Sequence, residues 1–173
     1  TLILSGANTY TGATNVTAGT LAYGASDVIA TGAVTVNGAT AVLDLGTYSA
    51  SVGGVTLSAG SITGSGTLTS TGGFTMNNAG ATSVSAILGG AVDLTKSAAG
   101  TLTLNNDATT IGGTWTDAAS IIGKMDGKFT QVTIANGDKY LTIGQDAGLA
   151  VITGTPKVIV TQNVAFRGTN DYS

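Results

Sequence analysis

Carboxylates are the side chains best suited to acid–base chemistry in this sequence, because all nine acids are aspartates and histidine and cysteine are absent. Their absence excludes imidazole bases, thiol nucleophiles and zinc sites built from those ligands. A pair of carboxylates about 5–10 Å apart could still cleave a glycosidic bond. The candidates are scattered along the chain: Asp27, Asp44, Asp93, Asp107 and Asp117. A polysaccharide-cleaving enzyme, with Arg167 or a late lysine as the base, is therefore a minor alternative. We predict no enzyme and no catalytic residue.

Calcium is the metal that the remaining aspartates could bind. Asp126, Asp138 and Asp146 lie in turn-like stretches late in the chain. Calcium loops need several oxygen ligands at a fixed spacing. Neither Asp-x-Asp-x-Asp nor Gly-Gly-x-Gly-x-Asp occurs. The prediction is that the protein has no cofactor and no metal site, with calcium as the alternative.

The charge content bears on partners. Only 9% of the residues are charged, the formal net charge is −3, and the six basic residues form no cluster. Nucleic acid is therefore excluded as an expected partner, since phosphate contacts require grouped lysine and arginine. No apolar run approaches the length of about 18 residues that spans a membrane.

Short alternating segments between glycines are the main structural signal. Each begins with glycine, continues as apolar-Thr-apolar and ends in small polar residues, as in GAVTVNG, GVTLSAG, GFTMNNAG and GTLTLNN. The apolar pairs are Val34/Val36, Val55/Leu57, Phe74/Met76 and Leu102/Leu104. A period of two places each pair on one face of a strand and the intervening threonine on the other. The sequence therefore predicts an all-β protein.

The spacing of these segments is near 20 residues, which is typical of a solenoid. The prediction is a parallel β-helix, or β-solenoid, over residues 1–114, with outward threonines and asparagines forming ladders along the stack. An antiparallel β-sandwich is the alternative, because it also uses many short strands. Its hairpin turns would be Asn37-Gly38 and Asn136-Gly137.

Residues 115–173 differ in composition, because most of the charged residues lie after residue 92. A short helix is predicted at 117–125, capped by Asp117. Further strands are predicted at 129–135, 139–144, 149–154 and 157–166. We expect this β-rich region to cap or dock onto the solenoid, or to continue it as one domain.

Residues 1–21, TLILSGANTYTGATNVTAGTL, resemble the autotransporter-associated β-strand repeat, a pattern of the form G-T-L-x-L-x-G-x-N-T-Y-x-G-x-T-x-V-x-x-G-T-L. Matching positions are Leu2, Leu4, Gly6, Asn8, Thr9, Tyr10, Gly12, Thr14, Val16, Gly19, Thr20 and Leu21. A weaker second copy is similar at residues 93–114, where Ala108-Thr109-Thr110 replaces Asn-Thr-Tyr. The resemblance implies a right-handed parallel β-helix in a secreted or surface-exposed bacterial protein. It implies an extracellular structural or adhesive role toward surface or matrix components.

The glycine-bounded stretch SGANTYTG is interpreted as a corner of the solenoid. Gly6 and Gly12 are expected to allow the backbone angles of a sharp corner. Asn8 is expected to hydrogen-bond nearby backbone, and Tyr10 to lie over the next coil with its hydroxyl in water. Leu2 and Leu4 are expected to point into the coil.

Self-association into a filament is the second functional hypothesis. Open strand edges can accept another chain, and such head-to-tail contacts do not close. The residues expected near the contact are Leu2, Ile3, Leu4, Val158, Ile159, Val160, Val164 and Phe166.

Overall fold

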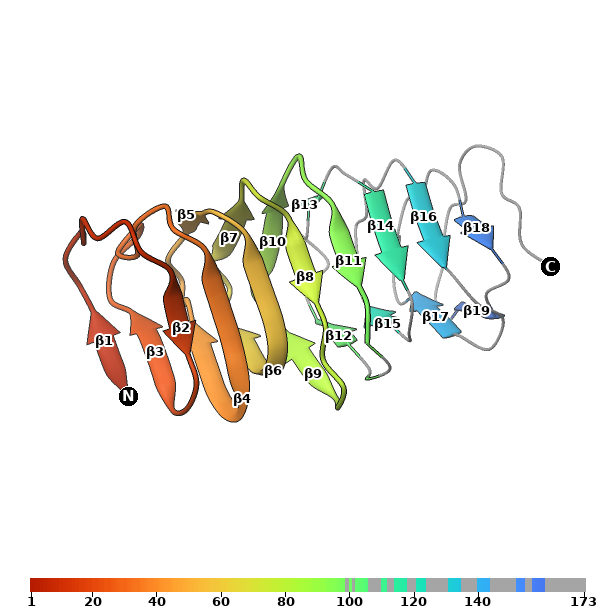
Figure 1. Cartoon of the computed structure of the whole chain (residues 1–173), viewed down its shortest axis with the longest axis horizontal. Coiled ribbons are helices and arrows are strands. Elements are labelled where there is room, and N and C mark those ends of the chain that lie inside the picture. Colours follow the sequence, from red (N-terminus) through yellow and green to blue (C-terminus); the bar gives the residue numbers. More distant parts are fainter. Residues whose placement is uncertain are drawn as a thin grey trace.

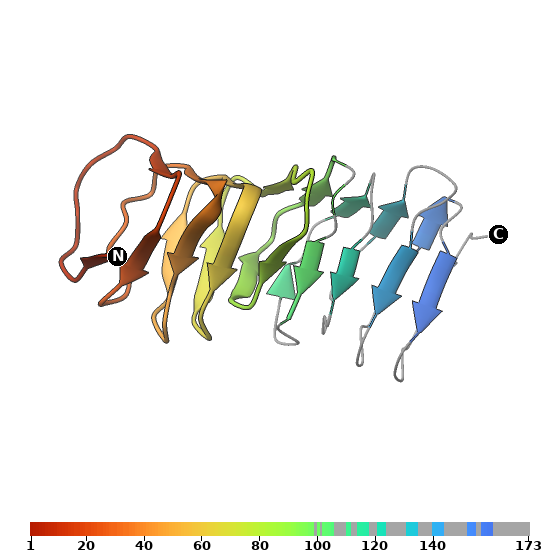
Figure 2. The ribbon, with the colours of Figure 1, turned by 90° about the horizontal axis from the view of Figure 1, so that it is seen from below.

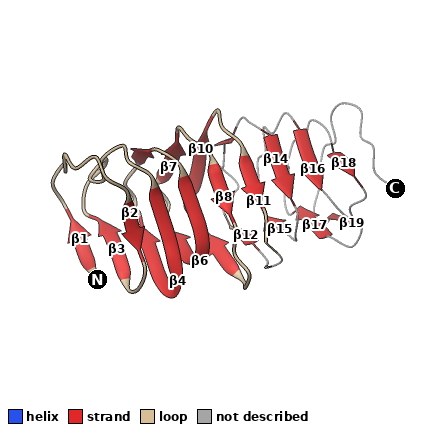
Figure 3. Ribbon diagram, viewed as in Figure 1, coloured by secondary structure: helices blue, strands red, loops and turns tan. Residues whose placement is uncertain are grey.

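The fold is an elongated stack of short β-strands (Figure 1). The computed structural model describes residues 1–98, 100, 102–105, 110–111, 114–117, 121–123, 131–134, 140–143, 152–154 and 157–160, the last seven of these ranges through their backbone alone. Every strand pair in this part of the chain is parallel. Strands are the regular elements drawn in Figure 3, and no described segment is a helix.

The strands form three rows along the stack, and each turn of the chain contributes one segment to each complete row. The first row contains β2 (Thr14–Val16), the start of β4 (Val34–Asp44), the start of β6 (Val55–Thr63), β8 (Phe74–Met76), β11 (Leu94–Lys96), β14 (Thr114–Asp117), β16 (Gln131–Ile134) and β18 (Ile152–Gly154). The second row contains β1 (Leu2–Leu4), β3 (Thr20–Tyr23), the ends of β4 and β6, β9 (Thr82–Val84), β12 (Leu102–Leu104), β15 (Ile121–Gly123), β17 (Tyr140–Ile143) and β19 (Lys157–Val160). The third row contains β5 (Ala50–Val52), β7 (Thr67–Ser70), β10 (Ile87–Gly90) and β13 (Thr110–Ile111).

The register repeats about every 20 residues. Val34 pairs with Val55, Val55 with Phe74, and Phe74 with Leu94. About five turns lie between Leu2 and Leu104, and the first two rows continue to β18 and β19. The strands stay side by side along the long axis when the molecule is turned (Figure 2). The predicted β-solenoid is confirmed.

The antiparallel sandwich is wrong. Asn37-Gly38, its proposed hairpin turn, lies inside β4, which runs from the first row into the second. The second proposed turn, Asn136-Gly137, lies outside the described residues. Parallel strands are connected by the rest of a coil and not by a tight hairpin turn. The Asn37-Gly38 pair therefore bends the chain at a corner and does not reverse its direction.

The core is a set of columns that run along the stack. Val34, Val55, Phe74 and Leu94 pair in sequence and are each at most 1% exposed. A second column joins Leu21, Leu43, Ile62, Val84 and Leu104, which are also buried. Each coil buries its apolar side chains against the coils on both sides, so the core is continuous along the solenoid.

Stacked glycines form the corners between rows. At Gly60 the backbone φ is +87°, and a Cβ would lie 2.2 Å from the carbonyl oxygen of Ala41 in the previous coil. A Cβ at Gly66 would lie 1.7 Å from the carbonyl oxygen of Tyr48. A side chain does not fit where the backbones of successive coils cross this closely, which explains why glycine occupies these two corner positions.

The predicted helix at 117–125 is wrong. Asp117 ends β14, and Ile121–Gly123 forms β15, while the other residues of that stretch lie outside the described part. Both strands pair with the preceding coils, since Leu94 is in register with Trp115 and Leu102 with Ile121. Stacking onto an existing strand outweighs the weak helical preference of this stretch.

Each of the later predicted strands contains a described strand. The stretches 129–135, 139–144, 149–154 and 157–166 contain β16, β17, β18 and β19, and their other residues lie outside the described part of the chain. These strands extend the first and second rows in parallel register. The predicted division of the chain into a solenoid at 1–114 and a separate C-terminal region at 115–173 stays a prediction.

Candidate functional site

The carboxylates of Asp27 and Asp44 stabilise corners of the solenoid. Asp27 has a positive φ of 53°, and its carboxylate accepts a hydrogen bond of 2.9 Å from the amide of Ser51 in the next coil. The Asp44 carboxylate accepts bonds from the amide of Gly46 at 3.0 Å and the hydroxyl of Thr63 at 3.2 Å. These contacts give two carboxylates structural partners at two different places along the stack.

The structure shows no group of three or more aspartates among the side chains that it describes. Asp93 lies on the approach to β11, and its backbone carbonyl accepts a bond from Phe74. Asp117 is placed in the first row by its backbone. Among the described residues no three acidic, histidine or cysteine side chains could hold a metal together. Asp107 and the aspartates of the calcium hypothesis, Asp126, Asp138 and Asp146, lie outside them.

A single file of threonines runs along the outer side of the first row. Thr35, Thr56, Thr75 and Thr95 occupy successive coils in register, and Asn15 precedes them. These five side chains are exposed or half-buried. The same register position is threonine in the next three coils of the row: Thr116, Thr133 and Thr153. The predicted outward ladder is therefore present, with a rise of about 4.8 Å per coil.

This threonine file is a regular surface feature of the first row. Threonine offers a hydroxyl that donates and accepts, beside a methyl group that packs on its neighbours. None of Asn15, Thr35, Thr56, Thr75 and Thr95 carries a charge. The surface is suited to broad, neutral contact and holds no group that could act as an acid or base near neutral pH.

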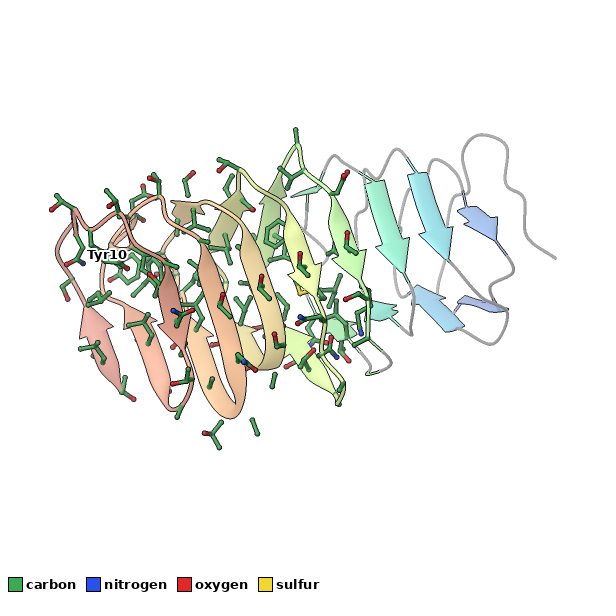
Figure 4. The ribbon with its side chains drawn as sticks, viewed as in Figure 1. Tyr10 is labelled. Carbon is green, nitrogen blue, oxygen red and sulfur yellow. The ribbon has the colours of Figure 1, made fainter. Side chains whose placement is uncertain are left out.

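The SGANTYTG stretch forms an exposed corner at the first coil. Asn8 donates from its amide to the carbonyl of Gly6 at 2.9 Å and to that of Val28, in the next coil, at 2.7 Å. The second bond joins two coils. Tyr10, labelled in Figure 4, lies near the N-terminal end of the stack, and its hydroxyl is 2.6 Å from that of Thr14. Its contact is therefore local, within its own coil.

The reason proposed for Gly6 and Gly12 is wrong. Neither has a positive φ, and a Cβ built on either would meet nothing within 4 Å. Gly12 instead limits the residue stacked beside it. A Cβ built on Gly32 would lie 2.4 Å from the carbonyl oxygen of Gly12. Gly19 differs, because its φ of +66° favours glycine directly.

An open cavity of about 390 Å³ lies at the first coil, lined by Leu2, Leu4, Tyr10, Val16 and Leu21 among others. Leu2 and Leu4 pair with Leu21 and Tyr23, which are buried. Leu2 and Leu4 therefore lie on the inner side of the coil, as expected. Leu2 is nevertheless 61% exposed, and Ile3 is 62% exposed. Of the residues expected near an assembly contact, Val158, Ile159 and Val160 form β19 with Lys157, while Val164 and Phe166 lie outside the described residues.

Tyr23 is a buried titratable residue of the first coils. Its side chain is buried at 5% exposure, and its hydroxyl has no hydrogen-bond partner. Burial raises the pKa of Tyr23 far above its usual value near 10, and nearby Tyr10 and Asp27 raise this pKa further. The phenol stays neutral in the folded protein, so it is a core side chain and not a base.

Lys96 is a buried residue that the sequence reasoning missed. It is 0% exposed, and its ammonium donates to the carbonyls of Asn78, at 3.2 Å, and Ala98. The signal was available in the period of two. Leu94 and Lys96 flank the outward Thr95, so an inward Leu94 implies an inward Lys96.

A comparison with protein families decides what the first coil is. Residues 1–22 match the passenger-associated-transport-repeat. The resemblance to the autotransporter repeat is thereby confirmed for this segment, which is one coil long in the structure. The weaker similarity at 93–114 stays a prediction. No curated protein and no solved structure matches the chain.

The passenger repeat and the observed fold agree with each other. The matched residues contain β1, β2 and three of the four residues of β3. β2 is the first strand of the first row, and β1 is the first strand of the second row. The chain is thus a β-solenoid that carries a passenger repeat in its first coil. The described part of the chain contains no helix that is long and apolar enough to cross a membrane.

Proposed function

We propose that this chain is an extracellular structural and adhesive module of a bacterial surface or secreted protein, without catalytic activity. The passenger-associated-transport-repeat at residues 1–22 is the observation that carries this proposal. Passenger repeats occur in proteins delivered to the cell exterior, and the β-solenoid fold is consistent with that role. The partners are surface or matrix components.

The side chains of the described coils support a mechanical role. Asp27, Asp44 and Asn8 each bond to backbone in an adjoining coil or corner. Their polar groups therefore hold the solenoid together. The threonine file offers repeated neutral contacts, each weak, that add along the length of the molecule.

Attachment of coated beads tests the adhesive role. Beads that carry the purified chain are expected to bind bacterial or host-cell surfaces, and beads coated with an unrelated protein are not. The variant Thr56→Lys/Thr75→Lys places charge on the threonine file and should reduce attachment severalfold. The control Thr40→Lys/Thr47→Lys adds the same charge at exposed corner positions away from the file.

The experiment tests the threonine file and the adhesive role separately. Equal attachment by the two double variants would remove the threonine file from the proposal. Failure of the wild-type chain to bind any cell or matrix surface, with its β-type circular dichroism intact, would overturn adhesion itself. Cleavage of a polysaccharide by the chain would support the enzymatic alternative instead.

Self-assembly is the second candidate function. It is favoured by the exposure of Leu2 and Ile3, two apolar side chains on one strand beside an open cavity. The partner would be a second copy, which adds a strand next to β1. Light scattering and electron microscopy of the isolated chain should show filaments, and Ile3→Lys should suppress them. A monomer at high concentration would contradict this candidate.

A further inference from the structure

The bend between the first and second rows has a different length in successive coils. Five residues (37–41) lie between Val36 and Val42 in β4. Between the register partners of these two residues, only three residues (58–60) lie in β6, and six (77–82) lie in the coil after it. The shortest bend therefore lies between two longer ones, along the lower edge of the molecule in Figure 1.

A cleft of about 290 Å³ lies over this short bend. Residues 58–61 form its floor, and its walls are parts of the two longer bends, as far as Val42 on one side and Thr82 on the other. Gly60 allows the short bend, because its φ is +87° and a Cβ there would lie 2.2 Å from the carbonyl oxygen of Ala41. The coils that form the walls are two coil spacings, about 10 Å, apart, so the cleft is one coil thick. We call it the corner cleft.

The corner cleft is lined by hydroxyl and methyl groups. Ser58 and Ser61 are half-buried in its floor, alanines and glycines make up most of the remaining lining, and no described residue that lines it is charged. Thr82 lines the same cleft and is only 7% exposed, and its hydroxyl has no hydrogen-bond partner in the described part of the chain. An enclosed hydroxyl without a partner is costly, so this group favours a ligand that can complete its hydrogen bonds.

We propose that the corner cleft binds one neutral sugar unit of a glycan. Sugar hydroxyls donate and accept, as do the hydroxyls of Ser58 and Ser61, and the C–H face of a sugar packs on alanine methyl groups. Another staggered rotamer of Thr82 turns its hydroxyl toward the sugar and supplies the missing bond. A volume at the lower end of the range for small-molecule sites suits a single ring. An acidic sugar is disfavoured, because the lining offers no opposite charge.

This site is separate from the threonine file. The file lies on the outer side of the first-row strands, whereas the corner cleft lies where the chain bends toward the second row. The proposal therefore does not rest on the adhesive role. Bead attachment and sugar binding are measured independently, so either can fail while the other stands.

Saturation-transfer difference NMR of the full chain is the test. The probes are the methyl glycosides of glucose, galactose, mannose and N-acetylglucosamine, with methyl glucuronide as the charged comparison. At least one neutral glycoside is expected to receive saturation and to bind with a weak, millimolar Kd, because one ring makes few contacts. The glucuronide should bind more weakly than that glycoside.

Two variants of one bend locate the binding. Ala81→Leu enlarges an exposed residue that lines the corner cleft, and it should abolish the saturation transfer. Ala79→Leu makes the same change at an exposed residue of the same bend that is not among the lining residues, and it should bind like the wild type. Circular dichroism should show β structure in both.

Thr82→Val tests the enclosed hydroxyl. The variant keeps the shape of the side chain and should weaken binding about fivefold, the usual contribution of one neutral hydrogen bond. Its midpoint of urea unfolding should stay the same or rise, because the unpartnered hydroxyl is removed. A purely structural role for Thr82 would instead lower the midpoint and leave the affinity unchanged.

Several results would overturn the proposal. One is the absence of saturation transfer to all four neutral glycosides while the chain is folded. Binding that survives Ala81→Leu, or that Ala79→Leu abolishes equally, would place the sugar elsewhere. Binding of the glucuronide alone, or of an extended Val-Thr peptide in place of any sugar, would assign a different ligand chemistry to the corner cleft.

Discussion

At the residue scale, each glycine has a role set by the backbone that lies beside it. Gly60 and Gly66 face carbonyl oxygens of the preceding coil at distances that exclude a Cβ, whereas Gly12 faces open space. The sequence alone does not distinguish these glycines. The structure separates those that need glycine from those that only tolerate it.

Gly60→Ala is expected to destabilise the solenoid. A φ of +87° and an oxygen 2.2 Å from the new Cβ force the corner to move. Strained backbone of this kind costs roughly 1–3 kcal/mol, and the clash adds to it. The midpoint of urea unfolding, followed by circular dichroism, should fall for Gly60→Ala and stay near that of the wild type for Gly12→Ala. Equal midpoints in the two variants would contradict the corner geometry.

Tyr23→Phe tests the buried phenol. The hydroxyl has no partner, so its removal should leave stability at neutral pH unchanged or raise it by about 1 kcal/mol. The raised pKa means that the folded chain keeps a proton that the unfolded chain releases. This difference in proton binding does not affect stability below about pH 10. Above that pH the free energy of unfolding falls as the pH rises.

The measurement is unfolding by urea at several alkaline pH values. Tyr23→Phe should lose less stability above pH 10 than the wild type, while Tyr48→Phe, at a side chain 37% exposed, should follow the wild type. Parallel curves for the wild type and Tyr23→Phe would show that the phenol is not buried as described.

At the element scale, the alternation of apolar and threonine residues determines which side of each strand is buried. Val55 and Leu57 are fully enclosed, and Thr56 between them is half-buried on the outer side. This alternation was sufficient to predict the strands at 34–36, 55–57, 74–76 and 102–104. The same alternation predicted the outward threonine ladder, because the outward position is threonine in successive coils of the first row.

Leu57→Ala is expected to lower the free energy of unfolding by about 2–5 kcal/mol, since it opens a cavity between packed coils. Thr56→Ala, one position away on the outer side, should cost about 1 kcal/mol or less. Chemical denaturation of both variants gives the comparison. If Thr56→Ala were the more damaging change, the assignment of inner and outer sides would be wrong.

The elements that sequence reasoning missed are those decided by neighbouring coils. Ile121–Gly123 has weak local preference, and it becomes a strand by pairing with Leu102–Leu104. The period of two places Lys96 on the inner side of its strand, although its charge alone would place it on the surface. The sequence does not show that the carbonyl groups of Asn78 and Ala98 accept hydrogen bonds from its ammonium there.

At the scale of the whole molecule, the spacing of the repeated segments was sufficient to predict the solenoid architecture. Segments about 20 residues apart imply coils that share one core, and the register confirms this from Val34 to Leu94. The convergence of aspartates could not be judged from sequence, because it depends on which corner each one reaches. Asp27 and Asp44 lie at different corners and bond to backbone there.

The most direct test of the parallel stack uses paired cysteines in a chain that has none of its own. Thr56 and Thr75 are register partners in neighbouring coils, and Thr95 lies one coil further. Neighbouring coils place the Cα atoms about 4.8 Å apart, within disulfide range, while two coils place them at about twice that distance, outside it. Under mild oxidation, Thr56→Cys/Thr75→Cys should form an intramolecular disulfide nearly completely, and Thr56→Cys/Thr95→Cys should not. A free Thr56→Cys/Thr75→Cys pair, or equal crosslinking in both variants, would contradict the parallel β-solenoid.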